Sequence, residues 1–260
     1  MCYHASQTKK VKQLEEHFKL PAANYIDTED FTNEEQFTGY HLNGYDHPDM
    51  IIIPQELNKE LHVGMWGLIP SENLASKQNE YYKSLKFPGS ALNSQSEKVF
   101  TYDLYKKSIL KRRCLIPLSG FFEPHKHKGV SHPVYFSRKD REVFCVAGIY
   151  TVTKDGAVTF SMLTKKASEW FGTIHNKSGD KRQIVILPQD LQMEWVRDDL
   201  KKEGIKELLN INYDEDDLEA TTISRDLFST SIDSNRNTIF DYYKYPGINE
   251  KEWDQNKNKF

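Results

Sequence analysis

Residues 113–124 read Arg-Cys-Leu-Ile-Pro-Leu-Ser-Gly-Phe-Phe-Glu-Pro, an apolar run that is broken at Ser119 and Gly120 and ends in a carboxylate. Apolar stretches at 134–136 and 143–152 follow, and we interpret them as paired strands. Residues 153–156 (Thr-Lys-Asp-Gly) predict a hairpin turn into another strand at 158–163. The middle of the chain therefore predicts a β-rich centre.

Working outward, the pattern predicts further short elements on both sides of this run. Strands are expected at 50–54, 61–69 and 184–187, with a last strand from Ile223. Helical spacing is expected at 6–20 (ended by Pro21), 74–86, 101–110, 165–171, 189–196 and 201–209, and the tail from Glu250 is expected to fray. Strands and helices mix without βαβ alternation, so we expect an α+β fold with a β-rich, barrel-like mixed-sheet core and peripheral helices, in a single domain over residues 1–260.

The composition excludes several classes of protein. The chain has 260 residues, a net charge of −3, 38% hydrophobic and 28% charged residues, which gives no global support for nucleic-acid binding. Its three cysteines form no CxxC pair, which argues against a disulfide framework or a structural zinc site and for a reducing compartment. The start has no apolar segment typical of a signal peptide, and no apolar run is long enough to span a membrane. We therefore expect a cytoplasmic protein.

Cys2 is the first candidate for chemistry. A small second residue generally allows Met1 to be removed, which would leave an α-amine (pKa about 7.7–8.0) and a thiol (about 8.5) on adjacent carbons. The amine can form a Schiff base with an aldehyde, and the thiol can then close a five-membered thiazolidine ring. The alternative is an inert cysteine that is buried as a small hydrophobic residue.

Other polar residues lie at the ends of apolar stretches. Glu123 follows two phenylalanines, and a carboxyl in apolar surroundings has a raised pKa that suits acid–base catalysis; otherwise it is an exposed turn residue. His175 could donate or shuttle a proton, or be a loop histidine without a role. Asn93 could hold a carbonyl or imine, or simply stabilise a turn.

Two features could contact nucleic acid. Trp66 could offer its ring to a base or sugar, although a tryptophan between apolar residues is more often part of the core. A set of cations could line a phosphate channel or form a solvated face: Lys111, Arg112, Arg113, Lys165, Lys166, Lys181 and Arg182. The sequence contains no P-loop, GxGxxG, HExxH or GxSxG motif, and we expect neither a metal nor a cofactor.

The order of several motifs resembles the SRAP (SOS response-associated peptidase) family. The motifs are Met-Cys at the start, Trp-Gly-Leu-Ile-Pro (66–70), an Asn-x-x-Ser-Glu loop (93–97), the Arg-Cys-Leu-Ile-Pro and Gly-Phe-Phe-Glu blocks (113–123), Ala-Gly-Ile-Tyr (147–150), Phe-Ser-Met-Leu-Thr (160–164) and Ile-His (174–175). The resemblance extends from Cys2 to about Ile223.

The resemblance implies a DNA-damage (SOS) response protein that covalently crosslinks abasic sites in single-stranded DNA through a thiazolidine on its N-terminal cysteine. It implies that Cys2 is the nucleophile and that Asn93 positions the N-terminus and the sugar. It further implies that Glu123 is the acid–base residue, while His175 holds or protonates the sugar oxygen. DNA contacts are implied at His4, Trp66, Gln95, Arg113 and Arg182.

The chain departs from the family pattern where DNA is bound. The family start Cys-Gly-Arg is here Cys2-Tyr3-His4, and the arginine of Asn-Ala-Arg-Ser-Glu is here Gln95. The tryptophan that often follows the Trp-Gly-Leu-Ile-Pro-Ser motif is absent, and the loop after His175 is longer, with Arg182 standing for the family arginine. A histidine is a weaker, pH-dependent substitute for an arginine fork. We therefore expect intact crosslinking chemistry with weaker binding of DNA.

Two alternatives remain open from the sequence. One is a peptidase or lyase with the N-terminal cysteine as its nucleophile, for instance a hydrolase that cleaves only its own initiator segment, with His175 activating the thiol. The other is a non-catalytic nucleic-acid or protein-binding module, which the missing arginines favour. We expect a monomer with single-stranded DNA as its partner and no association with membranes.

Overall fold

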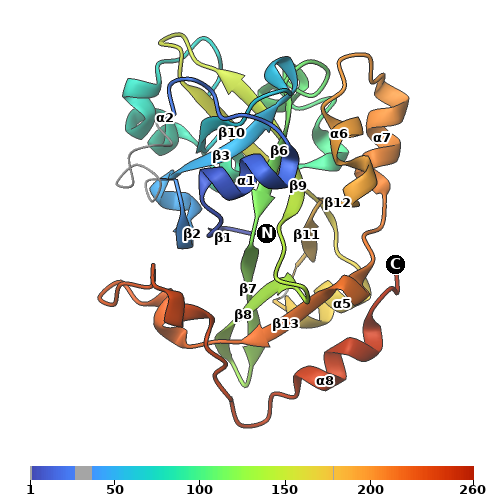
Figure 1. Ribbon diagram of the computed structural model, residues 1–260. Helices are drawn as coiled ribbons and strands as arrows, with labels where there is room; N and C mark the ends of the chain where they lie inside the picture. The colour runs from blue at the N-terminus through green and yellow to red at the C-terminus, as the bar shows by residue number, and fades with distance from the viewer. Residues whose placement is uncertain (1, 27–36, 178) are drawn as a thin grey trace.

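The computed structural model describes residues 2–26, 37–177 and 179–260 (Figure 1). Five strands close a ring: β3 (Asp49–Pro54), β4 (His62–Trp66), β6 (Arg113–Leu118), β9 (Phe144–Val152) and β10 (Val158–Lys166). The β10–β4 pair is parallel, and β4–β3, β3–β6, β6–β9 and β9–β10 are antiparallel. This mixed barrel confirms the predicted α+β fold. Strands β5 (Asn93–Gln95), β11 (Arg182–Ile184) and β12 (Ile186–Leu187) extend it.

A second sheet lies against the barrel and contains, in order, β13 (Leu218–Thr222), β8 (Val130–Arg138), β7 (Gly120–His127), β1 (His4–Gln7) and β2 (Gly39–Asn43). The chain passes from the barrel into this sheet at Ser119, where β6 ends and β7 begins. Gly120 is required there, because a Cβ at this position would lie 2.4 Å from the ring of Tyr135. The opening motif thus joins the two sheets.

Peripheral helices cover the sheets. They are α1 (Val11–Phe18), α2 (Gln78–Ser84), α3 (Gly89–Leu92), α4 (Asp103–Lys106), α5 (Glu169–Ile174), α6 (Gln192–Trp195), α7 (Lys202–Asn210) and α8 (Glu250–Trp253). In Figure 1, α6 and α7 lie beside the barrel, while α5 and α8 lie near the second sheet. No helix within the described residues is long and apolar enough to cross a membrane.

Side chains alternate between the two faces of each strand, and this alternation divides the hydrophobic core into separate clusters. On β3, Met50 and Ile52 belong to one hydrophobic cluster, whereas Ile51 and Ile53 belong to another. Both clusters are buried because successive side chains of a strand point to opposite faces, and helices or strands cover each face. Continuous apolar runs such as residues 50–54 therefore predicted these strands correctly.

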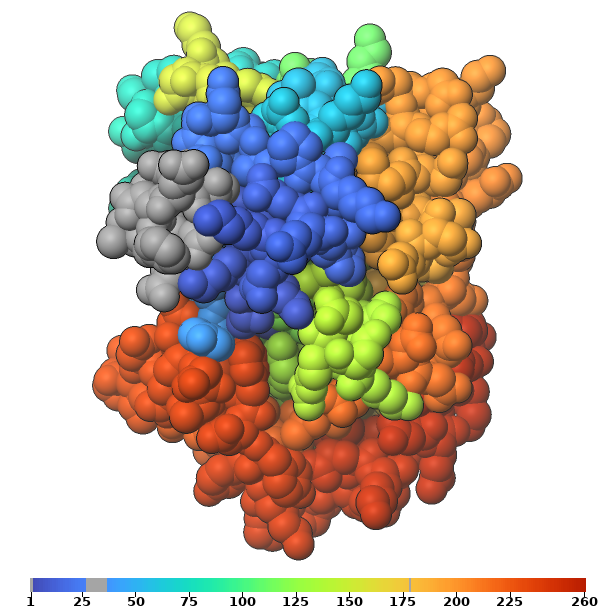
Figure 2. Space-filling view, viewed as in Figure 1, coloured from blue at the N-terminus to red at the C-terminus, as the bar shows by residue number. Residues whose placement is uncertain are grey.

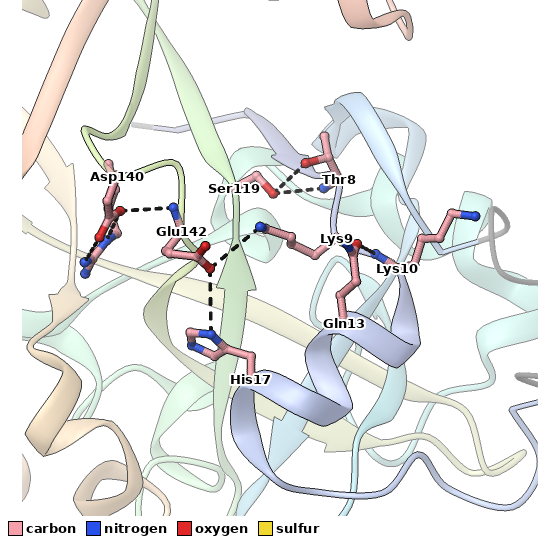
Figure 3. Close-up of polar contacts among 9 residues, drawn as sticks. Thr8, Lys9, Lys10, Gln13, His17, Ser119, Asp140 and Glu142 are labelled. Atoms are coloured by element: carbon pink, nitrogen blue, oxygen red, sulfur yellow. Dashed lines mark hydrogen bonds and ion pairs between the residues drawn. The ribbon is translucent and has the colours of Figure 1, made fainter.

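Polar contacts anchor the N-terminal segment (Figure 3). The backbone N–H and the hydroxyl of Thr8 donate to Ser119 Oγ at 3.0 and 2.9 Å, and Lys10 N donates to Gln13 Oε1 at 2.9 Å. Gln7 is buried and bridges Ile51 and the carbonyl of Pro117. The Gln7 and Thr8 contacts tie the end of β1 to β3 and to the junction of β6 and β7, while backbone pairing holds β1 between β2 and β7.

Three predicted elements need correction. The helix expected at 6–20 begins only at Val11, because Ser6 and Gln7 belong to β1, which pairs with β2 and β7. The strands at 134–136 and 143–152 do not pair with each other, since β8 is already bonded to β7 and β13 on its two edges. The short helix expected at 165–171 begins at Glu169, because Lys165 and Lys166 pair with β11.

The last part of the chain also differs from expectation. The final strand is β13, which ends before Ile223, and Ile223 forms only an isolated bridge with Tyr242. The tail from Glu250 was expected to fray, but it forms α8 and buries Trp253. Asn258 N donates to Glu215 Oε2 at 2.7 Å, which ties the tail to the body of the protein. In Figure 2 the C-terminal segment (red) covers the lower part of the visible face, below the N-terminal segment (blue).

Candidate functional site

Four predicted residues from four elements come together at the start of β1. Cys2 precedes β1, Asn93 begins β5, Glu123 lies within β7 and His175 follows α5. Strands β1 and β7 pair with His4 opposite Phe122, so the next residue of β7, Glu123, lies beside the chain that leads to Cys2. Asn93 Nδ2 donates to the carbonyl of Cys2 at 2.6 Å, and His175 Nδ1 lies 3.1 Å from Glu123 Oε2.

Cys2 is completely buried, and its sulfur donates to the carbonyl of His4 at 3.3 Å. Burial raises the pKa of the Cys2 thiol well above its ordinary value, and the negative charge of Glu123 raises it further. The resting thiol is therefore neutral, so any reaction at this sulfur needs a neighbouring group that can take its proton.

Glu123 can be that group. Its side chain is 3% exposed, and burial raises the pKa of its carboxyl from 4.5 to about 7. Burial also lowers the pKa of the adjacent His175 imidazole to about 4. Both shifts favour the uncharged forms, so at neutral pH the carboxyl of Glu123 exchanges its proton most readily. The alternative of an exposed turn glutamate does not fit this environment.

Asn93 presents one atom to the site without a protein partner. The residue is 1% exposed, and among the described residues no donor contacts its Oδ1. A buried amide oxygen without a partner carries a desolvation cost of about 1–3 kcal/mol. Because the same amide holds the carbonyl of Cys2, this oxygen is placed to accept a hydrogen bond from a group bound beside Cys2.

Two predicted DNA-contacting residues are buried, which corrects their assignment. Trp66 is 0% exposed, and its Nε1 donates to the carbonyl of Leu92, the residue before Asn93. Arg113 is also 0% exposed, and its guanidinium donates to the carbonyls of Ile109, Leu110, Trp195 and Arg197. Neither side chain has a surface that a DNA strand could contact here, so both serve the fold, Trp66 by supporting β5.

His4 is paired with another histidine rather than with solvent. Its Nδ1 lies 2.8 Å from His41 Nε2, and His41 Nδ1 lies 2.6 Å from Ser234 Oγ. Burial lowers the pKa of His4 to about 4, so this side chain is uncharged at neutral pH. It cannot supply the positive charge of the arginine that the family pattern has at this position.

Gln95 and Arg182 line a cleft of about 1360 Å³ between β5, β10, α5 and α7. Asn93 and Gln95 are two residues apart on β5, so the cleft begins about 7 Å from Asn93. Arg182 Nη2 is held 2.7 Å from Glu97 Oε2. The predicted cations Lys165, Lys166 and Lys181 line the same cleft, and so do Lys98 and Lys206, which no sequence motif indicated.

This cleft and the four-residue cluster are therefore neighbours rather than one pocket, since none of Cys2, Asn93, Glu123 and His175 lines the cleft. Within the described residues, no group of three or more histidine, cysteine, aspartate or glutamate side chains is arranged to hold a metal ion. The chemistry that this arrangement offers is a sulfur nucleophile with a proton donor and acceptor beside it.

Comparison with known proteins supports the predicted resemblance. The family model described as SOS response associated peptidase (SRAP) matches residues 1–230. The abasic site processing protein YoaM of Bacillus subtilis is 26% identical over 180 residues, which cover 67% of this chain and 73% of that protein. The yeast abasic site processing protein YMR114C is 24% identical over 174 residues, 66% of this chain and 45% of that protein. A crystal structure of a protein from Bacteroides thetaiotaomicron superposes with a TM-score of 0.78 at 26% identity, covering 94% of this chain and all of the other.

Proposed function

The chain belongs to the SOS response associated peptidase (SRAP) family, and from that premise we propose that it processes abasic sites in DNA by joining covalently to them through Cys2. The observation that carries this proposal is the convergence of Cys2, Asn93, Glu123 and His175, with a neutral thiol and a carboxyl of pKa about 7. The relatives from Bacillus subtilis and yeast are named as abasic site processing proteins.

The proposed reaction begins after Met1 is removed, when the nitrogen of Cys2 becomes an amine. Protonated Glu123, assisted by His175, donates to the ring oxygen of the abasic sugar while the anomeric hydroxyl gives its proton to water, and the ring opens to an aldehyde. The Cys2 amine adds to the aldehyde carbon and one water leaves, which gives an imine. The sulfur then adds to the imine carbon, its proton passes to Glu123 and the nitrogen is protonated. The net change is protein plus aldehyde to thiazolidine plus water.

The cleft supplies a path for the rest of a DNA strand. Lys98, Lys166, Lys181 and Lys206 line it, in a chain whose overall charge is −3, together with Phe100, whose ring centroid lies 6.0 Å from the Lys206 ammonium. Cations that follow a backbone, with aromatic side chains between them, suit single-stranded nucleic acid. In this proposal the lysines supply phosphate contacts in place of the two family arginines, at whose positions this chain has His4 and Gln95.

The cysteine-hydrolase alternative has less support. A thiol activated for peptide hydrolysis requires an imidazole within hydrogen-bonding distance. The Cys2 sulfur instead contacts the carbonyl of His4, and the His175 imidazole contacts Glu123.

The test is a denaturing gel shift with protein whose loss of Met1 is verified by mass spectrometry. A single-stranded oligonucleotide with one abasic site should form a heat-stable adduct with the wild type and with Cys145→Ala, a second buried cysteine. The adduct mass should equal the sum of the two reactants less one water. Cys2→Ala keeps the amine and should give a product only when borohydride reduces the imine. Absence of the adduct from Met1-free wild type, or peptide hydrolysis that depends on Cys2, would overturn the proposal.

A further inference from the structure

The residues on either side of His175 are bonded to strand β7. Before it, His125 Nδ1 donates to the carbonyl of Ile174 at 2.9 Å. After it, Asn176 Oδ1 accepts from Lys126 N at 2.7 Å and Asn176 Nδ2 donates to the carbonyl of Lys126 at 2.9 Å. The His175 imidazole itself lies against Glu123 of the same strand. Four contacts therefore join three consecutive residues, 174–176, to β7.

The amide of Asn176 pairs with both backbone groups of one residue, Lys126, as a neighbouring strand would. It therefore fixes the position of the chain along β7 as well as its distance from the strand. His125 and Glu123 are two residues apart on β7, so their side chains project to the same face. On that face His125 contacts the carbonyl of Ile174, and Glu123 contacts the imidazole of His175.

Two further contacts of His175 come from neighbouring segments: its N–H donates to the carbonyl of Phe171 at 2.7 Å, and its imidazole is hydrogen-bonded to the backbone of Arg182. Helix α5 spans only Glu169–Ile174, and helices this short are not stable by themselves. His175 has non-helical angles (φ −79, ψ 68), and beyond Asn176 the described residues before β11 (177 and 179–181) are exposed. This is the loop that is longer than the family pattern.

We propose that Asn176, together with His125, is a positioning residue that fixes the His175 imidazole against Glu123. The proposal rests on the proposed function for its consequence in catalysis, because a misplaced imidazole would neither hold the sugar oxygen nor share a proton with Glu123. Sequence gave no sign of this role, since Asn176 and His125 act through the backbone of neighbouring residues.

Residues beyond the family match support the same arrangement from the other side. The ring of Trp253 lies 5.0 Å from that of His125, and Asn256 Nδ2 donates to Thr173 Oγ1 at 3.3 Å. The N–H of Glu169 donates to the carbonyl of Lys259 at 2.9 Å. The family model ends at residue 230, so this C-terminal support of α5 lies outside it.

The test is a double-mutant cycle on the rate of adduct formation. Asn176→Ala should slow the wild-type rate roughly tenfold or more, because small misplacements of a catalytic group have large effects. The double variant Asn176→Ala/His175→Ala should react no more slowly than His175→Ala alone, because Asn176 acts through His175. Asn176→Asp keeps the acceptor for Lys126 N and should retain part of the rate. Asn58→Ala, which removes another amide contact to a backbone carbonyl (Val196), should react as the wild type does.

A second readout does not depend on the reaction. The pKa of the His175 imidazole, followed by NMR, should move towards its ordinary value in Asn176→Ala and stay at its wild-type value in Asn58→Ala. A wild-type rate and an unchanged His175 pKa in Asn176→Ala, or equal slowing by Asn176→Ala with and without His175, would overturn the proposal. If the wild type forms no adduct, the proposed function fails, and the NMR titration still decides whether Asn176 positions His175.

Discussion

Replacing Glu123 with glutamine should stabilise the protein at alkaline pH while it slows crosslinking. The substitution keeps the shape of the side chain and removes a carboxyl that is 3% exposed. In the folded protein the pKa of Glu123 is about 7, against 4.5 in the unfolded chain, so the folded state binds more protons between these values. Stability that is present below pH 4.5 is therefore lost as the pH rises through 7.

The magnitude follows from the two pKa values. The difference is 7 − 4.5 = 2.5, and at 1.36 kcal/mol for each pKa unit it corresponds to about 3 kcal/mol. As the pH rises from 4.5 to 8, the free energy of unfolding of Glu123→Gln should increase by that amount relative to that of the wild type. At 2–4 °C for each kcal/mol, Tm should rise by roughly 6–12 °C relative to the wild type over this range. His175 titrates in both proteins, so its contribution largely cancels in the difference.

The assay is thermal unfolding of wild type and variant in matched buffers from pH 4.5 to pH 8, with adduct formation measured on the same samples. Glu97→Gln is a control of opposite sign, because hydrogen bonds and charge from Arg182 outweigh partial burial and lower the pKa of Glu97. Loss of the Glu97 carboxylate should lower the free energy of unfolding at neutral pH, and it should lower it by less in acid. A stability difference between Glu123→Gln and wild type that does not change with pH would refute the raised pKa of Glu123.

Two further predictions concern the residues that were expected to contact DNA. Trp66→Phe should lower the free energy of unfolding by about 1–3 kcal/mol, because the carbonyl of Leu92 loses its donor, while fluorescence anisotropy below the melting temperature should show unchanged affinity for single-stranded DNA. Lys166→Ala/Lys181→Ala should weaken that affinity and reduce the slope of log K against log salt by about 0.7 for each lysine. Lys59→Ala, which lies outside the cleft, should leave the slope unchanged; an unchanged slope in the cleft variant would exclude a phosphate path there.

The strands could be predicted from sequence because burial on both faces produces continuous apolar runs, as at residues 50–54 and 143–152. Their partners could not, because adjacency in sequence suggested that β8 pairs with β9. Pairing depends on which edges are already occupied, and both edges of β8 are bonded to strands from distant parts of the chain. The start of α1 was misplaced for a similar reason, since the side chains of Ser6 and Gln7 find their hydrogen-bond partners more than 40 residues away.

The chemistry-bearing residues could be predicted because their side chains sit in recognisable motifs, as with Cys2 and Glu123. Side chains that act through another residue's backbone could not, as Asn176 shows. Burial was the other limit. Arg113 follows two cations and resembles part of a basic surface, yet carbonyls from two segments satisfy its guanidinium inside the protein. The sequence identifies a charged side chain, but only the fold shows whether that side chain binds a phosphate at the surface or backbone carbonyls in the interior.

The carboxyl of Glu123, 3.1 Å from the His175 imidazole, links the two halves of the proposed reaction. Ring opening and loss of water need an acid, whereas ring closure by the neutral Cys2 thiol needs a base. A carboxyl with its ordinary pKa would be ionised at neutral pH and could not donate a proton. A carboxyl whose pKa was raised far above 7 would stay protonated and could not accept one. Burial places the pKa of Glu123 at about 7, where both forms are populated. The apolar strand β7 raises this pKa by burying Glu123, and its pairing register with β1 places Glu123 beside Cys2. One sequence motif therefore determines both the position and the proton affinity of the acid–base residue.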